Sequence, residues 1–148
     1  MLVISRAKIS DVEEIKKLER RVWKEYMNLE DVTGDYGLGP LIRFGYVFVA
    51  KVDGKIVGVI VALKTKDSSV FVEDCVVDKK YRGQKNGRKI YEKLIEAVGN
   101  VHLVTWVNSR YVDSVEAHKK IGFKMHKIVK DPYGIGETED YFVVKRKS

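Results

Sequence analysis

The chain has 148 residues, of which 45% are hydrophobic and 33% are charged, a composition that suits one folded domain over residues 1–148 and excludes a disordered protein. No apolar run approaches the ~20 residues that cross a bilayer, and the first residues lack the pattern of a signal peptide. The lone Cys75 cannot form an internal disulfide, so we expect a cytoplasmic protein without membrane contact.

The positive charge is concentrated in one short segment. The net charge is +7, and residues 79–93 carry +6 of it, because seven basic side chains stand there against the single Glu92. Such concentration favours a local anionic ligand over a generally basic surface, although a solvated basic helix face is the alternative.

Hydrophobic periodicity and turn residues predict the elements in chain order. They are a strand at 2–7, a helix ending near Tyr26, a loop or short broken helix at 31–45, a hairpin turning at Asp53-Gly54, a strand at 70–78, a helix at 87–98, a strand at 101–107, a helix at 114–121 ended by Gly122, and strands at 124–130 and 139–146. This order predicts an α/β fold with a mixed central sheet of about six to seven strands and helices on both faces.

The segment from Arg82 to Gly87 links a predicted strand to a predicted helix. The first N–H groups of a helix lack partners within it, and the helix dipole adds partial positive charge, so this arrangement suits an anion. The segment is not a phosphate-binding GxxxxGK[ST] loop, because Gly83 and Gly87 are four residues apart, and it is not a GxGxxG dinucleotide motif.

Together with the preceding VEDCVVDKKY, this spacing resembles the acyl-CoA loop of the GNAT acetyltransferase superfamily, whose usual form is R/Q-x-x-G-x-G/A. Arg82 matches the first position and Gly87 the last, while Lys85 stands where the middle glycine usually is. The segment HKKIGF at 118–123 is similar to the family's YEKLGF, and the element order matches the family fold. The resemblance implies an N-acetyltransferase that moves an acetyl group from acetyl-CoA to a primary amine by direct attack in a ternary complex, without a metal.

The resemblance also implies which residues hold acetyl-CoA. Backbone groups of Cys75, Val76 and Val77 are expected at the pantetheine arm. The pyrophosphate is expected at the backbone of Arg82, Gly83, Gln84, Lys85, Asn86 and Gly87, with Arg88. Asn108 falls near the family's pantetheine-contacting asparagine, and Ser114 is expected to cap the following helix and touch the cofactor.

Four residues are candidates for proton transfer, one as a base and three as alternative acids. By resemblance Glu73 acts as a base through water, and strand alternation predicts that it shares a face with Cys75 while Asp74 shares one with Val70, Val72 and Val76. His118 occupies the position of the family tyrosine that protonates the departing thiolate. The alternatives are that His118 only caps or packs, with Tyr111 or Tyr91 acting instead, or that there is no dedicated acid.

Several questions stay open on the sequence alone. The acceptor is a small-molecule or peptide amine whose pocket we expect from 27–45 and 131–138, with Tyr36 and Phe44 as lining and Trp23 in the core.

Competing interpretations are a non-catalytic acyl-CoA sensor and a nucleic-acid-binding module that uses 79–93. Nucleic acid is disfavoured because the basic residues interleave with core-facing ones and no aromatic stacking platform accompanies them. A homodimer is compatible with the sequence.

Overall fold

The computed structural model of the chain describes residues 1–26, 37–131, 134 and 140–146. The described elements are β1 (Leu2–Arg6), η1 (Ile9–Asp11), α1 (Val12–Tyr26), α2 (Leu38–Phe44), β2 (Tyr46–Val52), β3 (Lys55–Lys64), β4 (Val70–Val77), η2 (Lys79–Tyr81), α3 (Asn86–Val98), β5 (Leu103–Asn108), α4 (Val112–Ile121), β6 (Lys124–Lys130) and β7 (Asp140–Arg146). The predicted order is confirmed, and the expected broken helix is α2.

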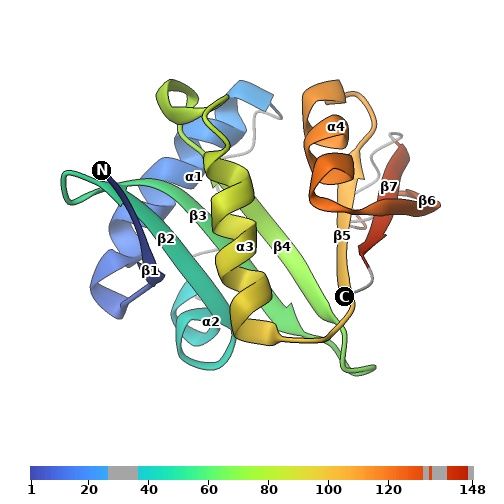
Figure 1. Cartoon of the computed structure of the whole chain (residues 1–148), viewed down its shortest axis with the longest axis horizontal. Coiled ribbons are helices and arrows are strands. Elements are labelled where there is room, and N and C mark those ends of the chain that lie inside the picture. Colours follow the sequence, from blue (N-terminus) through green and yellow to red (C-terminus); the bar gives the residue numbers. More distant parts are fainter. Residues whose placement is uncertain (27–36, 132–133, 135–139, 147–148) are drawn as a thin grey trace.

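The strands form one seven-stranded sheet in the order β1-β2-β3-β4-β5-β7-β6 (Figure 1). Neighbouring strands pair antiparallel except β4 and β5, which are parallel and are joined by the α3 crossover. The predicted mixed sheet is therefore confirmed.

Helices cover both faces of the sheet, as predicted. On one face, α1 buries Ile15, Leu18 and Val22 in a core that it shares with α2. On the other face, α3 buries Ile90 and Leu94 in a second core. Each such side chain contributes about 1.5–3 kcal/mol when fully buried. Figure 1 shows α3 in front of the sheet, with α1 and α2 behind it.

The parallel pair β4–β5 opens into a wedge. Among the described residues, the two strands pair only at Val70↔Leu103 and Phe71↔Val104, and they then separate toward their C-terminal ends (Figure 1). The Thr105 hydroxyl donates to the Val72 carbonyl oxygen across the narrow part of the wedge (2.9 Å). Beyond Val72, the edge of β4 that faces β5 is left open for a ligand.

A β-bulge interrupts β4 in the middle of this open edge. Val61 pairs with Asp74 and the next residue of β3, Ala62, pairs with Val72, so Glu73 is the extra residue. The predicted alternation is therefore wrong across the bulge: Val72 and Cys75 pack in the core on the α3 side, whereas Asp74 meets Trp23 of α1 and shares that side with Val76, as predicted.

Gly45, at the end of α2, allows close contact with β3. A Cβ atom there would lie 2.8 Å from the Ala62 carbonyl oxygen and 2.9 Å from the Leu41 carbonyl oxygen. Because backbone atoms cannot move aside cheaply, we expect Gly45→Ala to lower the free energy of unfolding by about 2 kcal/mol in urea denaturation. Gly87→Ala is the control, since a Cβ there meets nothing closer than Val77 at 3.9 Å. Equal stability of the two variants would contradict the proposed close contact.

Candidate active site

Two adjoining pockets fill the wedge between β4 and β5. The larger one, about 440 Å³, is lined by Val22 and Trp23 of α1, residues 75–77 of β4, Arg82, and residues 110–114. The smaller one, about 90 Å³, shares Trp23, Cys75, Tyr111 and Ser114 with it. Its lining also includes Glu73, Asp74, Tyr91, Thr105, Asn108 and His118. The structure thus brings all four candidates for proton transfer to one small pocket.

The loop before α3 is shaped by two left-handed residues. Gly83 has φ 76° and Lys85 has φ 59°, so the position where the family pattern has its middle glycine does take the conformation that favours glycine. The buried Asn86 side chain donates to the Tyr81 carbonyl oxygen (2.9 Å) and closes the loop. The Lys85 side chain makes no capping bond to the start of α3, which leaves the first-turn N–H groups available to an anion.

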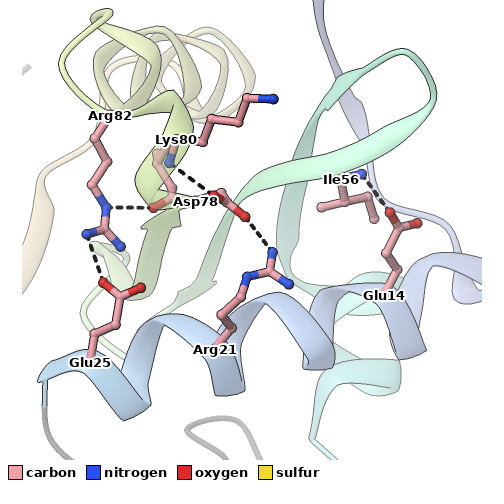
Figure 2. Close-up of polar contacts among 8 residues, drawn as sticks. Glu14, Arg21, Glu25, Ile56, Asp78, Lys80 and Arg82 are labelled. Carbon is pink, nitrogen blue, oxygen red and sulfur yellow. Dashed lines mark hydrogen bonds and ion pairs between the residues drawn. The ribbon is translucent and has the colours of Figure 1, made fainter.

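Arg82 links this loop to β4 and α1 (Figure 2). Its Nε–H donates to the Val77 carbonyl oxygen (2.8 Å), and its Nη1 lies 3.2 Å from a Glu25 carboxylate oxygen. A second ion pair joins Arg21 of α1 to Asp78, whose other oxygen accepts the Lys80 backbone N–H (3.1 Å). The guanidinium group is therefore oriented at the rim of the larger pocket before any ligand binds.

The other residues expected at the cofactor lie at different places around the wedge. Cys75 and Val77 are half-buried and Val76 is buried, all on the open part of β4. Asn108 lines the smaller pocket and accepts the Arg110 N–H (3.0 Å), so it also folds the turn before α4. Arg88 is exposed and pairs with Glu92 at 3.0 Å. The Gly83, Gln84 and Lys85 positions are exposed in the loop, and Gly87 is in the first turn of α3.

Ser114 does not cap α4, contrary to the prediction. The helix begins at Val112, with Tyr111 as its N-cap residue, so Ser114 lies in the first turn. Hydrogen bonds from the Tyr111 N–H to the Asn108 carbonyl oxygen (3.1 Å) and from the Val115 N–H to the Tyr111 carbonyl oxygen (3.0 Å) start the helix early. Ser114 nevertheless lines both pockets.

Acidic side chains from two elements meet at the α1 side of the smaller pocket. Burial raises the pKa of Glu73 above its usual value. Burial, followed by the neighbouring charge of Glu19, raises the pKa of Asp74 well above its usual range. Asp74 is only 4% exposed, so it holds its proton. Glu73 is half-buried and therefore ionises more readily than Asp74.

The raised pKa of Asp74 predicts that the folded protein becomes less stable as the pH rises. In the unfolded chain the Asp74 carboxyl group ionises near pH 3.8, whereas in the folded protein it keeps its proton to a pH well above that value. The free energy of unfolding therefore decreases as the pH rises through the folded-state pKa. Asp74→Asn cannot ionise, and we expect it to raise the Tm at pH 7 by roughly 2–4 °C, about 1 kcal/mol. Asp67→Asn should act oppositely, because hydrogen bonds from Thr65 and Ser69 lower the pKa of Asp67. A lower Tm for Asp74→Asn at pH 7 would contradict a neutral Asp74.

His118 forms a hydrogen-bonded pair with Tyr91 of α3. The Nε2 atom of His118 lies 2.9 Å from the Tyr91 hydroxyl, and its Nδ1 atom lies 2.7 Å from the Ser114 carbonyl oxygen. Burial lowers the pKa of His118 despite the opposing Ser114 bond, and burial also raises the pKa of Tyr91. Both side chains are therefore neutral near pH 7. Tyr111, the other candidate, is half-buried and lines both pockets.

The aromatic residues expected around the acceptor are distributed differently from the prediction. Trp23, assigned to the core, packs partly there but lines both pockets, and its Nε1–H points toward Asp74 Oδ2 at 3.5 Å. Phe44, expected to line the acceptor pocket, is 87% exposed at the end of α2 and belongs to neither pocket. Tyr36 and most of the two expected acceptor segments lie outside the described residues.

Two other classes of site find no support in the described part of the chain. Burial raises the pKa of Cys75, so its thiol stays protonated, which disfavours it as a nucleophile. No group of three His, Cys, Asp or Glu side chains is placed to hold a metal ion among the described residues.

None of the described helices has the length and apolar character needed to cross a bilayer.

Comparison with known proteins identifies the family. The model of the acetyltransferase (GNAT) family matches residues 12–123, and this chain belongs to that family of acetyltransferases. The matched range contains the wedge, the loop before α3 and His118. No curated protein sequence matches the chain.

Solved structures share the fold at low identity. An acetyltransferase of the GNAT family from Bacillus cereus is 15% identical, with a TM-score of 0.81 over 100% of this chain and 98% of that one. Arabidopsis thaliana Naa50, solved with the bisubstrate analogue CoA-Ac-MVNAL, is 17% identical, with a TM-score of 0.79 over 99% of both chains. A Bacillus anthracis protein with acetyl coenzyme A bound, whose suggested activity is that of a streptothricin acetyltransferase, is 22% identical, with a TM-score of 0.64. That match spans 70% of this chain but only 62% of the other.

Proposed function

We propose that the protein transfers an acetyl group from acetyl-CoA to a primary amine within a ternary complex. The observation that carries the proposal is the wedge between β4 and β5, which opens beside the Arg82–Gly87 loop at the start of α3. An extended pantetheine arm can pair with the open edge of β4 near Cys75 and Val77, while the pyrophosphate is held by the loop N–H groups and Arg82. The thioester then reaches the smaller pocket.

The chemistry needs a neutral amine and a site for the developing negative charge. An aliphatic amine has a pKa near ~10.4, so the extra proton of the ammonium must leave before attack. Glu73 is the base we propose, acting through water, since its raised pKa brings it closer to neutral pH. A backbone N–H near Val76 on the open edge of β4 is the candidate donor to the tetrahedral oxyanion.

The acceptor class is open between peptide amino termini and small amines. Naa50 was solved with an analogue that joins CoA to the peptide MVNAL, and the Bacillus anthracis protein is linked with streptothricin. Glu73, which lies beside Trp23 in the smaller pocket and carries a negative charge when it is ionised, favours an acceptor that arrives as a cation.

The test combines binding with turnover. Isothermal titration with acetyl-CoA should give a micromolar Kd, and thiol release should follow when a peptide with a free amino terminus, a lysine-containing blocked peptide or spermidine is added. Binding without transfer to any amine would favour the acyl-CoA sensor. Absence of any heat or thermal shift with acyl-CoA, with salt-sensitive binding to oligonucleotides, would favour the nucleic-acid module.

A further inference from the structure

Tyr91 and His118 approach each other from different helices inside the smaller pocket. Tyr91 belongs to α3 and is 2% exposed, while His118 belongs to the last turn of α4. Phe123 packs edge-on against both rings, at centroid distances of 5.6 Å and 5.4 Å. The two polar rings are therefore fixed by packing, and both line the pocket that holds Glu73 and Cys75.

The hydrogen bonds fix the position of each proton. A carbonyl oxygen can only accept, so His118 Nδ1 must carry the hydrogen that it donates to Ser114 (2.7 Å). In the neutral imidazole Nε2 is then an acceptor, and the Tyr91 hydroxyl donates to it (2.9 Å). His118 accordingly has no proton on Nε2, the nitrogen that faces Tyr91, and its Nδ1 hydrogen is held by Ser114, so it cannot directly protonate a thiolate in this state.

We propose that Tyr91 and His118 form a proton shuttle, in which Tyr91 is the catalytic residue at the reacting atoms and His118 stores the proton. The proposal rests on the acetyltransferase function above. The position of His118 alone would make this α4 residue the acid that protonates the thiolate. The proposal gives that role to Tyr91 of α3 instead.

The proton balance of the reaction fits the direction of these bonds. When the neutral amine adds to the thioester carbonyl, a C–N bond forms and the nitrogen acquires positive charge. Its proton passes to the Tyr91 oxygen while the Tyr91 hydrogen passes to His118 Nε2, giving an imidazolium whose Nδ1–H stays on Ser114. As the C–S bond breaks, its electron pair goes to sulfur, Tyr91 gives its proton to the thiolate, and His118 returns the stored proton to Tyr91.

The shuttle and Glu73 have separate tasks. Glu73 takes the extra proton of the ammonium before attack and passes it to solvent, whereas the shuttle moves one proton from nitrogen to sulfur. Both atoms are bonded to the same tetrahedral carbon, so one hydroxyl can serve both. The simpler alternative is that the pair only packs the junction of α3 and α4.

The test compares Tyr91→Phe, His118→Gln and the double variant, using thiol release with the same three amines. We expect kcat to fall about a hundredfold in each single variant, while the KM values stay within about twofold, because general acid–base steps act in the transition state. The double variant should be no slower than the slower single variant, since two residues of one relay are non-additive. The solvent isotope effect on kcat should shrink in all three.

Controls separate catalysis from folding. Tyr46→Phe removes a hydroxyl from a half-buried tyrosine outside both pockets and should keep the wild-type kcat. His118→Tyr on the Tyr91→Phe background supplies a new hydroxyl from α4 and should recover part of the lost kcat. A Tyr91→Phe enzyme as fast as wild type, or multiplicative losses in the double variant, would overturn the shuttle and leave the transferase standing. A wild type that transfers to none of the amines overturns both.

Discussion

Replacing Arg82 with alanine is expected to weaken acetyl-CoA binding about a hundredfold, or nearly 3 kcal/mol. The guanidinium group lies at the rim of the larger pocket, held by the Val77 carbonyl oxygen and by Glu25 (Figure 2). Charge-assisted bonds to a phosphate contribute about 1.5–3 kcal/mol each, and orientation before binding reduces the entropy lost. Isothermal titration with acetyl-CoA measures the change directly.

Glu25→Gln is the matched control for this prediction. It removes the carboxylate that lies 3.2 Å from Arg82 Nη1 but keeps a side chain of the same size. Since a bound pyrophosphate would compete with Glu25 for the guanidinium, the variant should bind acetyl-CoA as tightly as wild type or up to about threefold more tightly. If Glu25→Gln lost as much affinity for acetyl-CoA as Arg82→Ala, the role of Arg82 would be its contact with α1 and not a contact with the phosphate.

Features that depend on local sequence could be predicted. The hairpin at Asp53-Gly54, the C-cap at Gly122 and the strand–loop–helix around Gly83 follow from turn and helix-end chemistry within a few residues, and the structure places them as predicted. The loop resembles the family pattern although Lys85 replaces a glycine, because the neighbouring Arg82 and Gly87 keep the spacing.

Features that depend on contacts between residues far apart in the sequence could not be predicted. The bulge at Glu73 arises from the register between β3 and β4, which no alternation pattern within β4 contains. Trp23 reads as one more apolar residue of the α1 stripe, and only the opening of the β4–β5 wedge turns it into pocket lining. Tyr91 likewise fits the helical core pattern, and its bond to His118 joins residues that are 27 positions apart.

The bulge also determines which of two adjacent carboxyl groups can act as the base. Glu73 is the extra residue of the bulge and is half-buried, whereas the next residue, Asp74, is buried and lies near Glu19. If Glu73 is the base of the proposed reaction, Glu73→Gln should lower kcat/KM about a thousandfold at pH 7, within the range for general base catalysis. The Kd for acetyl-CoA should stay within about twofold, since the isosteric amide preserves packing.

The pH dependence identifies the group independently. The base must be ionised, so wild-type kcat/KM should fall as the pH drops through the Glu73 pKa, which burial raises above 4.5. Glu73→Gln should lose this acid limb. Asp74→Asn should keep it and retain activity within about fivefold, because an amide resembles the protonated acid that burial enforces at Asp74. If Asp74→Asn instead removes the limb and Glu73→Gln keeps it, the ionised carboxylate is Asp74 and the base is reached from the α1 side of the bulge.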